Sequence, residues 1–242
     1  MKLLVSGCSA SSGYGFPKEI NDPDSWPMQL SNKLGAELTN VSKAGHNNPA
    51  IFLHALKEFT TDHYDIILLQ MTEFKRISFS INFHLQTVTG NEGNISNGLV
   101  DDKSYATFRK VFTLLNQGWK HWNELMSIII SVQNLVKQGY NIRFINAAID
   151  WEKDFFDNRH SDFSRYIIEY DNLPDDMINE ALDKIEEDKK KIDLDLWVGA
   201  YPNLFKQHID NVAEGDMHPG KNSATMYADI IHDYLTKQGL VK

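Results

Sequence analysis

The stretch YDIILL, residues 64–69, decides the fold of this chain. It is an apolar run that follows the polar residues 60–63, and such a run predicts a strand with both faces buried. A second short apolar run, residues 2–6, ends at Gly7 and predicts another strand of the same kind. Strands buried on both faces are typical of parallel sheets that helices cover on both sides.

Helical and strand-like segments alternate on either side of these two runs. Ser25 precedes an amphipathic segment that Gly35 ends, which predicts a helix over residues 25–34. Periodicity predicts further helices at 49–60, 106–138, 174–193 and 222–238, and further strands at 36–41 and 141–147. The alternation predicts an α/β fold, with a mostly parallel sheet in the middle layer of an α/β/α sandwich.

The length and composition are those of an ordinary globular protein. A chain of 242 residues with 42% hydrophobic and 24% charged residues fits one domain, 1–242, and excludes disordered and fibrous classes. Residues 72–105 lose the periodic pattern, so we expect an irregular excursion over the carboxyl edge of the sheet. The net charge of −9 argues against a nucleic-acid partner, because such a partner requires a basic face.

The sequence also bears on location and cofactors. Cys8 is the single cysteine, which excludes an internal disulfide. Too few apolar residues precede it for a signal peptide, and no apolar run approaches the roughly 18 residues of a membrane span, so a cytoplasmic protein is expected. The histidines, among them His46, His54 and His63, show no metal-ligand spacing, so neither a metal nor a cofactor is expected.

Polar residues and glycines follow the predicted strands, where ligands bind in sheets of this type. Ser9 follows the first strand, and its hydroxyl needs an adjacent base to act as a nucleophile. His218 is the candidate base and Asp216 the candidate group that orients it. The candidate donors to a developing oxyanion are the backbone amides of Ser9 and Gly45, with the side chains of Asn47 or Thr72 beside them.

The sequence resembles the SGNH (GDSL-type) hydrolases, a family of esterases and acyl-hydrolases. The first block of that family is matched by Gly7-Cys8-Ser9 with a trailing Gly15, as in a subgroup with Gly-Cys-Ser. The second block is matched by Gly45, and the last by His218-Pro219. The resemblance spans the chain from end to end, although its motifs are short. It implies a flavodoxin-like sheet of about five parallel strands in the order 2-1-3-4-5.

Two positions depart from the family pattern. In the third block, Gly-x-Asn-Asp, Thr72 stands in place of the asparagine that donates to the oxyanion. In the last block the aspartate normally lies three residues before the histidine, whereas Asp216 lies two residues before His218. We therefore expect a partly displaced carboxylate, with a Ser-His dyad as the alternative to a full triad.

The resemblance implies serine-dependent hydrolysis of a small ester, with an acetyl group on a carbohydrate as the favoured substrate. One alternative is a phosphate- or nucleotide-binding α/β protein, because a Ser- and Gly-rich loop after a strand can hold an anion. Against it, both common phosphate-binding fingerprints are missing and the first basic residue of the loop is Lys18. Another alternative is an inactive relative that binds carbohydrate or a partner protein. The natural substrate, the choice between hydrolysis and acyl transfer, and the oligomeric state stay open.

Overall fold

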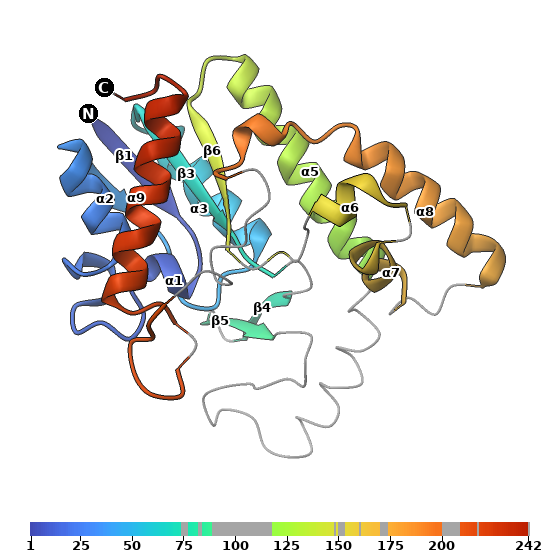
Figure 1. Ribbon diagram of the computed structural model, residues 1–242, viewed down its shortest axis with the longest axis horizontal. Coiled ribbons are helices and arrows are strands. Elements are labelled where there is room, and N and C mark those ends of the chain that lie inside the picture. Colours follow the sequence, from blue (N-terminus) through green and yellow to red (C-terminus); the bar gives the residue numbers. More distant parts are fainter. Residues whose placement is uncertain are drawn as a thin grey trace.

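A computed structural model, shown in Figure 1, describes residues 1–73, 77–81, 84–88, 118–147, 149, 153–159, 161–169, 174–199, 209–216 and 218–241. Its central sheet has the strand order β2-β1-β3-β6, and all neighbouring strands are parallel. These strands span Lys2–Ser6 (β1), Glu37–Asn40 (β2), Ile66–Met71 (β3) and Ile142–Asn146 (β6). Both apolar runs of the sequence are therefore neighbouring strands at the centre of one sheet.

The helices and the remaining short elements lie between and after these strands. The α-helices span Ser9–Ser12 (α1), Trp26–Leu34 (α2), Asn48–Phe59 (α3), Gly118–Lys137 (α5), Lys153–Asp157 (α6), Asp162–Glu169 (α7), Asp175–Lys189 (α8) and Lys221–Lys237 (α9). Two 3₁₀-helices span Glu19–Asn21 (η1) and Leu194–Leu196 (η2). The predicted helix over 106–138 is confirmed from Gly118 onward, and its first part lies outside the described residues.

Among the described residues the central sheet has four strands rather than the five that were expected. At the place of the fifth strand, Trp197 makes a single parallel bridge with Phe144, and the backbone N–H of Val198 donates to the Phe144 carbonyl at 2.9 Å. The preceding residues form η2, where the Asp193 side chain accepts from the N–H of Asp195. Because a 3₁₀-helix coils the backbone, the residues of η2 cannot extend beside β6, and Trp197 alone forms a bridge there. The predicted order 2-1-3-4-5 is otherwise kept.

The side chains of the sheet alternate between two apolar clusters, one on each face. Leu3 and Val5 face the cluster under α2 and α9, whereas Leu4 faces the cluster under α3 and α5. This alternation follows from the period of two in a strand, and it explains why the strands read as continuous apolar runs. The chain is thus an α/β/α sandwich, as expected (Figure 1).

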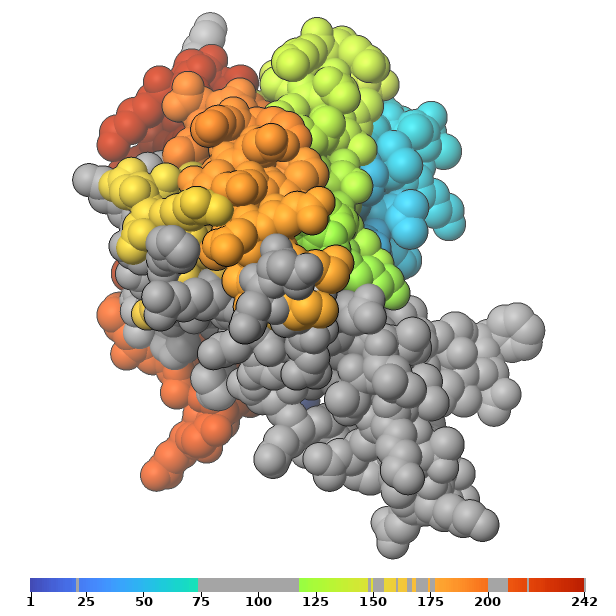
Figure 2. All heavy atoms as spheres, turned by 90° about the vertical axis from the view of Figure 1, so that its right-hand side faces the viewer, coloured from blue at the N-terminus to red at the C-terminus, as the bar shows by residue number. Residues whose placement is uncertain are grey.

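A further helical layer lies outside α5. Figure 2 shows α8, in orange, beside α5, in green, with α3 beyond it in blue. The indole Nε1 of Trp122 on α5 donates to the Asp188 carboxylate on α8 at 3.1 Å, and the ammonium groups of Lys184 and Lys191 each lie 2.8 Å from the same carboxylate. These contacts satisfy a charged group that is almost fully buried.

Two loops are more regular than the sequence indicated. The interval 72–105 was expected to be irregular, but its described part contains an antiparallel hairpin of Ile77–Ile81 (β4) and His84–Val88 (β5). The Ser- and Gly-rich loop after β1 begins with the short helix α1, which was not predicted from the sequence. The predicted start and stop of α2 are confirmed, with Gly35 in the left-handed conformation at its end.

Candidate active site

The candidate nucleophile lies directly after the first strand. Ser9 is the first residue of α1, and its side chain is partly exposed. Its carbonyl accepts hydrogen bonds from the Ser12 hydroxyl at 3.0 Å and from the backbone N–H of Tyr14 at 3.2 Å. The hydroxyl of Ser9 lies 4.0 Å from the Cys8 sulfur. Because Ser9 begins a helix, its N–H is among those that have no acceptor within the helix.

Gly45 and Asn47 lie in the loop that follows β2. Gly45 has a φ of +85°, a conformation that favours glycine. Asn47 caps α3, since its side-chain oxygen accepts from the backbone N–H of Ala50 at 3.0 Å. That capping contact occupies the oxygen and leaves the amide nitrogen as the group that could donate to a substrate.

His46, between these two residues, is almost fully buried and stacks on His54 with the ring centroids 4.6 Å apart. Burial, together with the charges of His54 and Lys43, lowers the pKa of His46 to about 4, although hydrogen bonding to the backbone of Gly7 acts in the opposite direction. The ring is therefore neutral at pH 7. It links the loop after β2 to the turn after β1.

Thr72 lies at the end of β3, where the family pattern has asparagine. The Asn48 side chain binds both backbone groups of Thr72. Its oxygen accepts from the Thr72 N–H at 2.8 Å, and its nitrogen donates to the Thr72 carbonyl at 3.1 Å. The Thr72 hydroxyl is buried and has no hydrogen-bond partner among the described residues. A buried hydroxyl without a partner is unusual, and a ligand group is one explanation for it.

His218 and Asp216 lie on a short loop just before α9. The loop is closed by an antiparallel bridge between Asn211 and Pro219 and by a hydrogen bond from the Val212 N–H to the His218 carbonyl at 3.1 Å. The Nδ1 atom of His218 lies 2.6 Å from Oδ1 of Asp216. A carboxylate can only accept, so Nδ1 donates in this contact, and in the neutral form of the ring Nε2 is then the atom with the lone pair.

The expected displacement of the Asp216 carboxylate is therefore wrong. The shorter spacing brings the side chain back onto its own loop, where Oδ1 accepts from the backbone N–H of His218 at 2.7 Å as well as from the ring. An aspartate side chain reaches a backbone N–H two residues ahead with little strain. Three quarters of the His218 side chain is buried, so the pair is only partly open to solvent.

Tyr14 connects the loop of His218 with the turn of Ser9. Its backbone N–H binds the Ser9 carbonyl, and its ring packs on the imidazole of His218 with the centroids 4.7 Å apart. The next residue, Gly15, has a φ of +90°, and a Cβ atom there would lie 2.6 Å from Cγ2 of Val212. The two loops are thus in direct contact, at the carboxyl edge where the site was expected.

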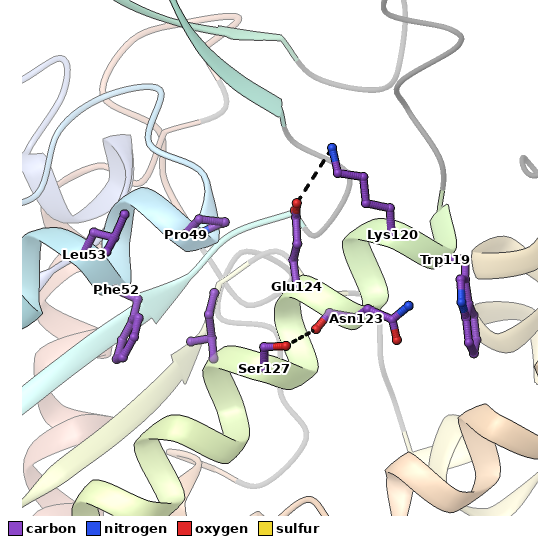
Figure 3. Close-up of a pocket in the computed structure, with 9 residues that line it drawn as sticks. Pro49, Phe52, Leu53, Trp119, Lys120, Asn123, Glu124 and Ser127 are labelled. Carbon is purple, nitrogen blue, oxygen red and sulfur yellow. Dashed lines mark hydrogen bonds and ion pairs between the residues drawn. The ribbon is translucent and has the colours of Figure 1, made fainter.

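A groove of about 640 Å³ lies between α3 and α5 (Figure 3). One of its lining residues, Pro49, follows Asn48, whose side chain binds the backbone of Thr72 at the end of β3. One wall is apolar, whereas the other carries polar groups, among them the ion pair of Lys120 with Glu124 at 3.9 Å. The lining residues are Pro49, Phe52, Leu53, Trp119, Lys120, Asn123, Glu124, Ser127 and Ile128.

In the described part of the chain, no three His, Cys, Asp or Glu side chains are grouped so that they could hold a metal ion. None of the helices that the structure describes is long and apolar enough to cross a membrane.

Sequence reasoning missed three residues of this region: Tyr14, Asn48 and Gln70. Tyr14 stands between two glycines of the first loop, and an aromatic residue in such a place was a usable signal. Asn48 and Gln70 gave no signal, because their roles depend on which groups of distant segments their amides reach.

The comparisons with known proteins concern the fold. No protein-family model matches the sequence, and a search of curated proteins gave no match. The solved structure of TesA is similar with a TM-score of 0.51 and 13% identity over 100% of both chains. The psychrotrophic esterase EstA from Pseudoalteromonas sp. gives 0.49 and 14% over 98% of this chain and 97% of that one. An acetyl xylan esterase, Est2A, from Butyrivibrio proteoclasticus gives 0.46 and 16% over 100% and 64%.

The likeness to TesA, together with the strand order, establishes the fold. It confirms the α/β/α fold that the resemblance to SGNH hydrolases implied, with four strands in place of five. A fold of this kind hosts many activities, so the activity has to be argued from the site.

Proposed function

We propose that the chain is a serine esterase of the SGNH type, with Ser9 as nucleophile, His218 as base and Asp216 as the group that orients the base. The observation that carries the proposal is Tyr14, which binds the Ser9 carbonyl through its backbone and packs its ring on His218. That contact brings the two loops together, and Asp216 leaves Nε2 of His218 able to accept a proton.

In the proposed reaction, Oγ of Ser9 attacks the ester carbonyl carbon as its proton passes to Nε2 of His218. The negative charge on the carbonyl oxygen is held by the backbone N–H groups of Ser9 and Gly45, with Asn47 and Thr72 as supporting donors. The tetrahedral intermediate collapses to an acyl-serine, and His218 gives its proton to the leaving alcohol. Water, deprotonated by His218, then releases the acid and restores the serine.

The proposed substrate is a small acyl group, such as acetyl, on a carbohydrate. The groove between α3 and α5 supports this choice, because one wall offers apolar surface and the other offers amide, carboxylate, ammonium and hydroxyl groups. A sugar is complementary to such walls, since the C–H groups of its ring faces pack on apolar surface and its hydroxyls need hydrogen-bond partners. A long acyl chain would instead require a wholly apolar cavity.

The nucleophile is tested by Ser9→Ala with p-nitrophenyl acetate and by labelling with a fluorophosphonate. We expect labelling to disappear and kcat to fall by about 10³-fold or more. Ser131→Ala is the matched control, because Ser131 is an exposed residue of α5, far along the helix from its start. Equal rates for Ser9→Ala and the native chain would refute the assignment.

The substrate class is tested by comparing p-nitrophenyl acetate with an O-acetylated oligosaccharide. Leu53 lines the groove and is 59% exposed, so Leu53→Asp changes the apolar wall without opening the core. We expect kcat/KM for the oligosaccharide to fall by about tenfold, with p-nitrophenyl acetate unaffected. Lys57→Ala, one turn further along α3 and outside the groove, is the control.

A further inference from the structure

Gln70 is a polar residue in an otherwise apolar strand. β3 reads IILLQM, every residue of it is buried, and Gln70 is only 1% exposed. Burying an amide costs free energy unless both its oxygen and its nitrogen find partners. The partners of this amide therefore indicate what the residue does.

Both ends of the Gln70 amide bind the turn that carries Ser9. Oε1 accepts a hydrogen bond from the Ser11 hydroxyl, and Nε2 donates to the Cys8 sulfur at 3.2 Å. These partners lie on either side of Ser9 in the chain. Gly7 makes the approach possible, because a Cβ atom there would lie 2.7 Å from Oε1 of Gln70.

The same turn is held from the opposite side by the last residue of β2. Nδ2 of Asn40 donates to the Ser11 carbonyl at 2.8 Å, and its Oδ1 accepts from the N–H of Ser42 at 3.1 Å. Because β1 lies between β2 and β3, the turn after β1 is clamped by an amide side chain from each neighbouring strand.

We propose that Gln70 is the positioning residue of the nucleophile turn, acting on Ser9 through Cys8 and Ser11. The inference rests on the proposed role of Ser9 as nucleophile. Gln70 does not contact the substrate. Its amide holds the side chains of Cys8 and Ser11, on both sides of Ser9 in the chain, and a displacement of about 1 Å in a reacting group can cost about 10²-fold in rate.

The first test is kinetic and uses Gln70→Met, which keeps the length of the side chain and removes both hydrogen bonds. We expect kcat for p-nitrophenyl acetate and the rate of fluorophosphonate labelling to fall together by about 10- to 100-fold, with KM changed by less than about twofold. The matched control is Asn146→Leu. Asn146 is an equally buried amide on the neighbouring strand β6, and it holds Ile149 instead of the nucleophile turn.

The second test does not depend on activity. Cys8 is the only cysteine of the chain and is buried, so its reaction with a thiol reagent such as dithionitrobenzoate reports on this turn alone. We expect the reaction to be about tenfold faster in Gln70→Met, because the opening of a loosened turn is more frequent, and unchanged in Asn146→Leu.

The outcomes separate the two proposals. Unchanged kcat and an equally protected Cys8 in Gln70→Met would overturn the positioning role. If the native chain neither labels nor cleaves esters, the proposed esterase function fails, and the thiol rates still decide whether Gln70 holds the turn. Should Gln70→Met not fold, Ser11→Ala removes one of the two contacts, and a smaller fall in kcat, about three- to tenfold, is then expected.

Discussion

Oδ1 of Asp216 accepts two hydrogen bonds from His218, one from the ring Nδ1 at 2.6 Å and one from the backbone N–H at 2.7 Å. Because only an oxygen can accept from an N–H, the backbone contact keeps a side-chain oxygen at position 216 directed toward the His218 ring. The orientation of the His218 ring is thus set by contacts between two residues of one loop, Asp216 and His218.

This arrangement predicts an unusual response to Asp216→Asn. In a serine triad the amide typically costs about 10⁴-fold in kcat, because it favours the wrong tautomer of the histidine. Here the backbone N–H of His218 keeps the amide oxygen toward Nδ1, so the tautomer is preserved and only the charge is lost. We expect a loss of about 10- to 100-fold for Asp216→Asn and a larger loss, about 10³-fold, for Asp216→Ala.

Steady-state kinetics with p-nitrophenyl acetate separate the two variants. Asp229→Asn is a suitable control, because Asp229 forms a surface ion pair with Lys33 on the outer helices at 2.7 Å. Equal losses in Asp216→Asn and Asp216→Ala would show that the backbone contact does not hold the amide in place.

A second prediction concerns the ring of Tyr14. It packs on the imidazole of His218 with the two ring planes tilted by 46°, and Tyr14 itself is 45% exposed, so little core packing depends on it. We expect Tyr14→Phe to keep full activity, because the ring contact is retained, and Tyr14→Ala to lower kcat by about three- to tenfold. The melting temperatures of the same variants should differ little. This would show that the Tyr14→Ala change displaces His218 and leaves the fold intact.

The strand ends of the candidate site could be predicted from the sequence alone. Apolar runs fixed the places of β1 and β3, and the rule that ligands lie at carboxyl ends placed Ser9 and Thr72 at one edge. The end of α2 and the start of α3 can be predicted equally well, because Gly35 ends a helix and Asn47 caps one through the backbone nearest to them.

Features that depend on distant neighbours could not be predicted. The neighbouring places of β1 and β3 were expected, but not which side chains of the first turn the Gln70 amide reaches. The Tyr14 contact requires the loop after residue 209 to lie beside the first turn. The fifth strand was expected from the family resemblance and not from an apolar run of this sequence. At its place the structure has η2 and a single bridge between Trp197 and Phe144.

A third prediction uses Gly15, where the two loops meet. Gly15→Ala meets two penalties, the strain of a φ near +90° and a Cβ atom 2.6 Å from Cγ2 of Val212. We expect a loss of about 1–3 kcal/mol in the free energy of unfolding and a fall in kcat, because the loop of His218 must move. Chemical denaturation and kinetics on one preparation measure both.

Gly35→Ala provides the comparison for that experiment. Gly35 also has a positive φ, +57°, but a Cβ atom there would meet nothing within 4 Å. Gly35→Ala should therefore lower the free energy of unfolding through backbone strain and leave kcat unchanged. Adding Val212→Ala to Gly15→Ala should recover part of the lost activity, and no recovery would mean that the contact between the loops does not position His218.

The last prediction is a pH dependence of stability that arises from His46. The unfolded chain has an ordinary histidine pKa of 6.5 at this position, whereas burial, with help from His54 and Lys43, lowers the pKa in the folded chain to about 4. Between these two values the unfolded chain binds a proton that the folded chain does not. The free energy of unfolding must therefore fall as the pH drops through this window, and the loss is complete below pH 4.

The size of the effect follows from the shift. A difference of about 2.5 pKa units corresponds to about 3 kcal/mol, most of which should be lost between pH 7 and pH 4.5. His46→Gln removes the titrating group, so urea unfolding of this variant should lose about 2–3 kcal/mol less over the same interval, whatever its stability at pH 7. His63→Gln is the matched control, because the His63 side chain is 88% exposed and its replacement should leave the slope unchanged. Parallel pH profiles for the native chain and His46→Gln would contradict the prediction, since they would show that His46 takes up its proton equally well in the folded protein.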